Sequence, residues 1–216
     1  MSNKYCPITN DILEDCQNNI IIMCGTDGSA INNGPKNLRV SGYGSAIIYN
    51  EAANSHTSEN KKKHYIKIYG KVPNEDILGN GNICIPSNNR GELMAIYRTL
   101  IWINENIEFD NYLIIIIDCG IYLNIMKKLR VSSDSFINSK KNSDILFKIR
   151  EELINYFIDN QHDPIFIKIK SHVSKKLIDK NCNSINKIAF MLNDKADELS
   201  NLGRNLNHYN EIIKTN

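Results

Sequence analysis

The order of strand and helix patterns along the chain constrains its fold more than any other feature. Three runs rich in β-branched and aromatic residues come first, at residues 20–30, 41–50 and 64–72, separated by turn-forming or polar stretches. Strands in such close succession favour an antiparallel meander. A continuous apolar run, Leu113–Ile117, comes later and is typical of a strand buried on both faces of a sheet.

Helical patterns alternate with strand patterns in the second half of the chain. Helices are predicted, mainly from apolar residues three and four positions apart, over residues 89–106, 121–130, 143–159 and 193–202. The alternating run at 166–170 predicts one further strand. Strands first and alternation afterwards indicate an α/β (mixed α+β) fold. We expect a five-stranded mixed sheet, with three antiparallel strands followed by parallel strands, flanked by helices.

We expect one domain, from residue 20 to residue 205. Residues 1–19 are polar and without a sustained period, so we interpret them as a poorly ordered N-terminal extension. Residues 206–216 are interpreted as a C-terminal tail. Within the domain, the weakly patterned segment 173–192 is interpreted as an insertion.

Composition excludes several classes of function. The chain has 26 Lys and Arg against 24 Asp and Glu, and a net charge of +2, so it is not a protein that coats nucleic acid by bulk charge. Its six cysteines include no C-x2-C pair, which argues against a zinc knuckle or a dithiol motif. No apolar run approaches the roughly 20 residues of a membrane span. We expect a cytoplasmic protein in a reducing compartment, with no membrane partner, and do not exclude the nucleus.

Four carboxylates lie where strands end or helices begin. Asp27 and Asp118 follow apolar strand residues. Glu92 falls in the first turn of a predicted helix, and Asp197 in the first turns of the last one. Singly, each is explained as a turn former, a helix-start residue or a surface charge. Neighbouring strands, however, could bring Asp27 and Asp118 within a few ångströms, where like charges repel unless cations neutralise them.

An acidic cluster of this kind predicts bound divalent cations. Hard oxygen ligands select Mg²⁺ or Mn²⁺. Two such ions in one site can activate water and stabilise the leaving oxygen of a phosphoryl displacement. On a nearly neutral protein, the pattern therefore indicates metal-dependent phosphodiester chemistry.

The chain contains, in this order, TDGS at Thr26–Ser29 with GYG at Gly42–Gly44, NNRGELMAI at Asn88–Ile96, the strand-ending Asp118, SH at Ser171–His172 and NDKADELS at Asn193–Ser200. Taken together, these motifs resemble those of the ribonuclease H (type 1) family. The resemblance covers residues 20–203. It implies a ribonuclease H fold and endonucleolytic cleavage of the RNA strand of RNA/DNA hybrids, with two Mg²⁺ or Mn²⁺ ions per active site.

The resemblance also implies roles for individual residues. The family's metal-binding carboxylates correspond to Asp27, Glu92, Asp118 and Asp197. Its mobile histidine, which helps product release or protonation, corresponds to His172. The register of the last motif selects Asp197 rather than Asp194, which would be a nearby supporting or capping acid.

Three further residues are expected to bind the hybrid. Asn88 and Asn89 precede Glu92, and their amides can donate to and accept from the 2′-hydroxyls of an A-like duplex. The resemblance implies minor-groove contacts for both, and Asn88 could also cap the helix. Gly28, which has no Cβ, would let its backbone N–H approach an RNA phosphate. Arg90 is interpreted as a structural or ion-pairing residue. We expect an RNA/DNA hybrid as the partner of a monomeric protein.

The sequence departs from the family's pattern after the third carboxylate. Cys119 and Gly120 stand where the family often has Ser and then a polar residue that can touch the substrate. Residues 131–142 are a short polar stretch in place of the basic, tryptophan-containing protrusion of bacterial members, and Trp102 is expected in the core. Lysines gather at 168–176 and 127–128. A solvated face is their default interpretation, and phosphate contacts are the alternative.

Two other functions remain open on the sequence. One is a catalytically silent module that binds hybrid or RNA, which the intact carboxylates argue against. The other is a DNA-directed nuclease of the same superfamily, which the paired asparagines argue against.

Overall fold

A computed structural model describes residues 7–9, 12, 20–31, 39–50, 63–107, 111–170 and 173–215. His172 and most of the expected extension 1–19 lie outside these residues. Within that extension, Ile8 is buried, and the Asn186 side chain accepts from its backbone N–H and donates to its carbonyl, at 3.0 Å each. This part of the extension therefore packs on the domain.

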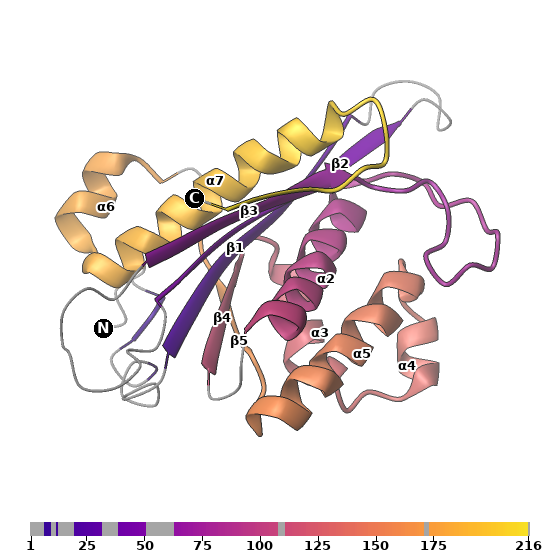
Figure 1. Ribbon diagram of the computed structural model, residues 1–216, viewed down its shortest axis with the longest axis horizontal. Helices are drawn as coiled ribbons and strands as arrows, with labels where there is room; N and C mark the ends of the chain where they lie inside the picture. The colour runs from indigo at the N-terminus through magenta and orange to yellow at the C-terminus, as the bar shows by residue number, and fades with distance from the viewer. Residues whose placement is uncertain are drawn as a thin grey trace.

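A six-stranded mixed sheet forms the centre of the molecule (Figure 1). Its strands are β1 (Ile20–Ile31), β2 (Val40–Asn50), β3 (Lys63–Lys71), β4 (Asn111–Ile117), β5 (Ile165–Lys168) and β6 (Ile212–Thr215). The order across the sheet is β5-β4-β1-β2-β3-β6. The predicted meander β1–β3 is antiparallel, and β4 and β5 are parallel to β1. The mixed α/β fold class is confirmed.

The predicted count of five strands is wrong, because the sheet has a sixth. Strand β6 comes from residues 206–216, which we expected to be a tail, and it pairs antiparallel with β3. Glu211, just before β6, accepts hydrogen bonds from Tyr43 Oη at 3.0 Å and Arg98 Nε at 2.6 Å. These two contacts come from β2 and from the helix that follows β3. These hydrogen bonds hold the start of the short strand β6 against the sheet, and the sequence pattern of residues 212–215 alone does not predict them.

Helices cover both faces of the sheet (Figure 1). They are α2 (Asn88–Asn106), α3 (Gly120–Leu129), α4 (Asp134–Asn138), α5 (Ser143–Asn160), α6 (Lys175–Asn181) and α7 (Ser184–Arg204). One hydrophobic core joins α2, α3 and α5 to one face of the sheet, and a second core joins α6 and α7 to the other. Trp102 is buried in the first core, as predicted.

The last helix is longer than its pattern predicted. We expected a helix over 193–202, but α7 begins at Ser184, where the Asn183 side chain accepts from the Asn186 N–H. The expected insertion 173–192 therefore contains α6 and the first half of α7. Polar residues interrupt the apolar period there, although Ala189 and Phe190 are buried against the sheet.

A missing Cβ lets α7 lie close to the sheet. A Cβ placed on Gly44 would lie 2.3 Å from the Ser200 backbone nitrogen, and one on Gly25 would lie 2.3 Å from the Leu192 carbonyl oxygen. Any side chain at these positions would push the helix away.

No helix in the described part of the chain is long and apolar enough to cross a membrane.

Candidate active site

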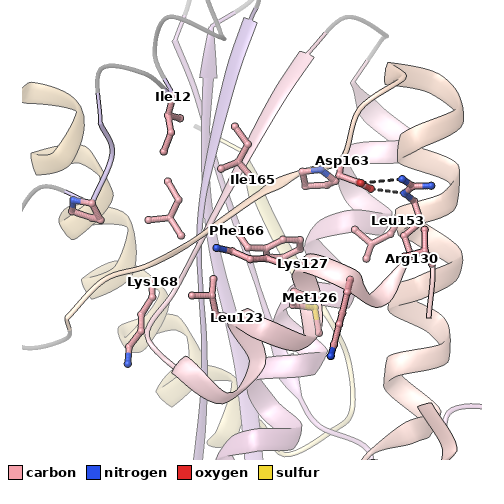
Figure 2. Close-up of a pocket in the computed structure, with 15 residues that line it drawn as sticks. Ile12, Leu123, Met126, Lys127, Arg130, Leu153, Asp163, Ile165, Phe166 and Lys168 are labelled. Carbon is pink, nitrogen blue, oxygen red and sulfur yellow. Dashed lines mark hydrogen bonds and ion pairs between the residues drawn. The ribbon is translucent and has the colours of Figure 1, made fainter. Parts of the chain in front are cut away.

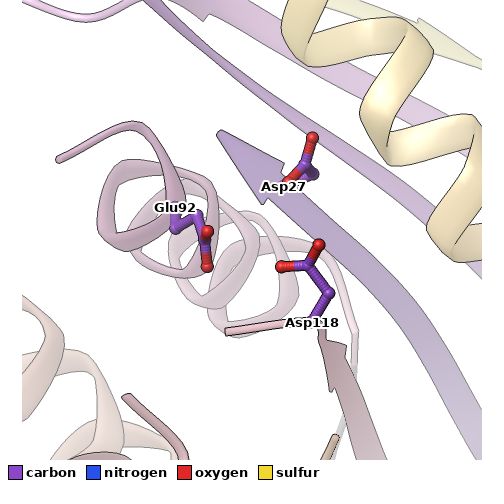
Figure 3. Close-up of side chains that lie close together, drawn as sticks. All are labelled: Asp27, Glu92 and Asp118. Atoms are coloured by element: carbon purple, nitrogen blue, oxygen red, sulfur yellow. The ribbon is translucent and has the colours of Figure 1, made fainter. Parts of the chain in front are cut away.

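Three of the four predicted carboxylates meet at one point of the molecule. Asp27, Glu92 and Asp118 each offer one oxygen, and these atoms all lie within 4.8 Å of one another. Figure 3 shows the three side chains converging from β1, from α2 and from the residue after β4. The structure thus brings together residues that are 65 and 26 positions apart in the sequence. No lysine or arginine is among the described groups that shift the pKa of Asp27 or Glu92.

The strand register explains why Asp27 and Asp118 are neighbours. Gly25 on β1 pairs with Ile116 on β4 in the parallel ladder, so both carboxylates lie two residues beyond a matched pair. The Thr26 hydroxyl also donates to the Ile116 carbonyl at 3.2 Å. Asp27 is 9% exposed and Asp118 is half-buried. The proximity expected from the ends of neighbouring strands is therefore a consequence of parallel pairing.

Glu92 reaches the cluster from the second turn of α2. The Ser87 side chain accepts from the Arg90 N–H at 3.2 Å and caps the helix, which begins at Asn88. We placed Glu92 in the first turn, and that was wrong: Ser87 is the cap, so Glu92 is the fifth helical residue. Asn88 and Asn89 are the first two helical residues, and both are exposed.

Gly28 is a spacer between β1 and α2. A Cβ on Gly28 would lie 2.2 Å from the Glu92 nitrogen and 2.5 Å from the Asn88 carbonyl oxygen. Any larger residue would therefore force the helix, and Glu92 with it, away from Asp27. This contact gives a packing reason for the glycine, in addition to the phosphate contact that we predicted.

The cluster raises the pKa of two of its members. Burial raises the pKa of Asp27 to about 7, with the negative charges of Asp118 and Asp197 adding to the shift and a hydrogen bond from Ser200 opposing it. Burial and the charges of Asp118 and Asp27 raise the pKa of Glu92 to about 8. Buried like charges without a counterion are unfavourable. The site is therefore suited to a bound cation, and its oxygen ligands suit Mg²⁺ or Mn²⁺.

Asp197 lies beside the cluster but is not one of its three converging groups. It is exposed on α7, and its Oδ1 accepts from the Asn201 side chain at 3.2 Å. Its charge nevertheless contributes to the raised pKa of Asp27. Asp194 is also exposed and lines a separate pocket with Tyr65 and Ile178.

Ser200 joins the site without having been predicted from the sequence. The Ser200 hydroxyl lies 3.0 Å from Asp27 Oδ2 and 2.9 Å from the Asp197 carbonyl, and the Ser29 hydroxyl donates to the Ser200 carbonyl at 2.8 Å. Ser200 thus ties α7 to the first carboxylate. Its spacing of three residues after Asp197, on the same helix face, was the available signal.

Arg90 has the structural role that we expected. It is fully buried and makes a two-pronged contact with Asp144 on α5, at 2.9 and 2.7 Å. It also donates to the Glu75 carbonyl at 3.0 Å. These bonds fasten the start of α2 to α5 and to the loop that precedes α2.

Of the comparisons with known proteins, the one with solved structures identifies the fold. No protein-family model matches the chain, and no curated protein sequence does so. Among solved structures, LC9-RNase H1, a type 1 RNase H with the type 2 active-site motif, aligns with a TM-score of 0.55 at 12% identity, over 86% of this chain and 72% of that chain. The foamy viral protease-reverse transcriptase in complex with dsDNA aligns with a TM-score of 0.50 at 15% identity, over 88% of this chain and 96% of that chain. Together with the sheet order and the helices on both faces, these alignments show that the chain has a ribonuclease H-like fold.

Proposed function

We propose that this protein is a divalent-metal-dependent ribonuclease H that cleaves the RNA strand of RNA/DNA hybrids. The observation that carries the proposal is the convergence of Asp27, Glu92 and Asp118 within 4.8 Å in a ribonuclease H-like fold. Asp27 is buried and the other two carboxylates are partly buried, so their mutual repulsion costs stability in the absence of a cation. A binding module would gain nothing from acids that face substrate phosphates, so the cluster favours an enzyme.

The carboxylate oxygens of Asp27, Glu92 and Asp118 suit Mg²⁺ or Mn²⁺, and we propose a pair of ions at this site. Asp27 and Asp118 would bind both ions, and Glu92 and Asp197 would complete one site each. Two bound ions supply an activated water as the nucleophile and stabilise the leaving oxygen. The protein's own part is to hold the carboxylates in register through the β1–β4 ladder and to orient Asp27 through Ser200.

The neighbourhood of Glu92 supports an RNA/DNA hybrid as the substrate. Asn88 and Asn89 are exposed one turn before Glu92, and Gly28 packs against the backbone of this turn. Amide side chains there could bind 2′-hydroxyl groups, which distinguish RNA from DNA. His172 is proposed to assist product release or protonation. LC9-RNase H1, with which the chain shares its fold, is itself a type 1 RNase H.

The test is a side-by-side cleavage assay with the purified chain. End-labelled RNA/DNA hybrid, single-stranded RNA, double-stranded RNA and double-stranded DNA are incubated with Mg²⁺, with Mn²⁺ and with EDTA. We expect nicks in the RNA of the hybrid only, and only with metal. Hybrid binding without cleavage in either metal would support the silent module instead, and preferential cutting of DNA would support a DNA-directed nuclease.

A further inference from the structure

Lys168 occupies an unusual place beside the carboxylate cluster. It is the last residue of β5 and pairs in the parallel ladder with Ile117, the residue before Asp118. Its ammonium lies over Gly120, where an added Cβ would be only 2.8 Å from Lys168 Nζ. The two parallel strands β4 and β5 thus end side by side, one with the metal-site acid Asp118 and the other with a cation.

The surroundings of Lys168 leave its charge available. The side chain is exposed, and within the described residues it makes no ion pair with a carboxylate. Lys168 does not contribute to the pKa shifts of Asp27 or Glu92 either. Within the described residues, no carboxylate of the cluster is therefore an ion-pair partner of Lys168.

Two adjoining cavities share Lys168 as a wall. One, of about 400 Å³, is lined by Asp118, Lys168, Ile169 and Lys170. The other, of about 500 Å³, lies along β5 and α3, and Figure 2 shows Lys168 at one end and Arg130 with Asp163 at the other. Arg130 is neutralised by that ion pair, whereas Lys168 is not. Lysines Lys127, Lys128 and Lys170 also line one or the other cavity, and Lys168 is the lysine that lines both and lies beside Asp118.

We propose that Lys168 binds a backbone phosphate of the nucleic-acid substrate next to the bond held at Asp118. This inference rests on the proposed function. A phosphodiester strand carries one negative charge per nucleotide, so a strand whose scissile phosphate lies at Asp118 places further phosphates along the adjoining cavity. Lysine acts on phosphate as a compact point charge with rotatable donors. Gly120 leaves the space in which this ammonium lies.

The first experiment measures binding and cleavage separately in Lys168→Gln. Affinity for a labelled hybrid is measured by fluorescence anisotropy in EDTA over a series of salt concentrations, and kcat and KM are measured with Mg²⁺ or Mn²⁺. We expect affinity to fall about tenfold, as for loss of one charged hydrogen bond. The slope of log affinity against log salt should flatten by about one. The value of kcat should stay close to wild type, because the contact is made equally before and during reaction.

Matched variants separate this role from a general loss of charge. Lys214→Gln removes an exposed lysine from β6, at the opposite edge of the sheet, and should leave affinity and salt slope unchanged. Lys168→Arg keeps the charge and should retain most of the affinity. Gly120→Ala places a methyl group against the ammonium, so it should weaken binding by displacing Lys168.

The double variant Lys168→Gln/Gly120→Ala decides whether the two residues act together. We expect it to bind no more weakly than Lys168→Gln alone, because both changes remove the same contact. Unchanged affinity and salt slope in Lys168→Gln, with a wild-type protein that cleaves hybrid, would overturn the inference and leave the proposed function standing. Additive losses in the double variant would also overturn it. A wild-type protein that does not cleave hybrid would instead overturn the proposed function.

Discussion

Two residues apart on α2, Arg90 and Glu92 bring charge into opposite surroundings. Arg90 is fully buried against Asp144, and although burial alone would raise the pKa of that carboxyl, the hydrogen bonds and charge of Arg90 lower it. Glu92 faces only like charges, and its pKa rises to about 8. Arg90 thus has its counterion, Asp144, within the protein. The described charges that act on Glu92 are Asp118 and Asp27, and neither can serve as a counterion. The contrast separates a charge that holds α2 in place from one that we propose binds a metal ion.

The largest expected effect is a loss of catalysis, and it comes from a change in the carboxylate cluster that contains Glu92. Asp118→Asn keeps the shape of the side chain and removes the charge that would bind both ions. We expect hybrid cleavage to fall about a thousandfold, since a catalytic metal ion contributes several kcal/mol to the barrier. The rate is measured on labelled hybrid, with Asp159→Asn as a control that changes an exposed carboxylate on α5, outside the cluster. Full activity of Asp118→Asn would rule out the proposed site.

Breaking the compensated pair should cause the largest loss of folding stability. Arg90→Met leaves Asp144 buried without its partner, which costs about 3–5 kcal/mol. Urea unfolding monitored by circular dichroism measures the loss. The double variant Arg90→Met/Asp144→Leu should recover much of it, because no unpaired charge remains. A loss below about 1 kcal/mol in Arg90→Met would show that the pair does not anchor α2.

The contributions of the carboxylate cluster and of Asp144 to folding stability should change with pH in opposite directions. Asp27 and Glu92 have raised pKa values in the folded protein, so their stabilising contribution is complete below about pH 4 and is lost as the pH rises through about 7 to 8. The lowered pKa of Asp144 instead contributes stability above its ordinary value of 3.8, and this contribution is lost as the pH falls.

A neutral variant makes this difference measurable. Without metal, Glu92→Gln should be about as stable as wild type at pH 5 and more stable by about 2 kcal/mol at pH 9. Thermal unfolding over this pH range gives the difference between the two proteins. Mg²⁺ should raise the wild-type melting temperature more at pH 8 than at pH 5.5, because cation binding competes with protons for the same carboxylates. A pH-independent difference between the variants would contradict the assigned charge repulsion.

The smallest expected effect concerns the hydroxyl that touches Asp27. Ser200→Ala removes a hydrogen bond that lowers the pKa of Asp27, so the pKa should rise further and stability should fall by about 1 kcal/mol. Isothermal titration with Mg²⁺ should show weaker binding at pH 7 than in wild type. Ser139→Ala, at an exposed helix end, is the matched control. Equal Mg²⁺ affinity in the two variants would show that Ser200 does not orient the ligand.

Strong local patterns predicted most of the sheet correctly. The runs that became β1, β2 and β3 are rich in β-branched and aromatic residues and are separated by turn-forming or polar stretches. The apolar run of β4 is buried throughout its centre. Composition and run length were therefore enough to predict these four strands. Strand β6 was missed because its place in the sheet depends on hydrogen bonds between Glu211 and the distant residues Tyr43 and Arg98. The start of α7 was missed because polar residues weaken the period between Ser184 and Leu192.

The candidate site shows the same division between local and distant information. Asp27, Glu92 and Asp118 were predicted from strand ends and motif spacing, and their convergence follows from parallel pairing of β1 with β4. The contact between Ser200 and Asp27 joins residues 173 positions apart, and its one local signal is the position of Ser200 three residues after Asp197 on α7. Lys168 was noted only as one member of a lysine cluster, because its position over Gly120 depends on the register of β5.

The pairing of β1 with β4 also has a consequence for how the protein folds. Residues 25 and 116 must find each other across the whole meander and α2 before Asp27 and Asp118 can meet. Contacts at such sequence separation form slowly, because loop closure must come before the contacts that reward it. A chain in which only the β1–β3 meander has formed therefore has no assembled metal site. The proposed nuclease activity should therefore appear only after these two distant strands have paired.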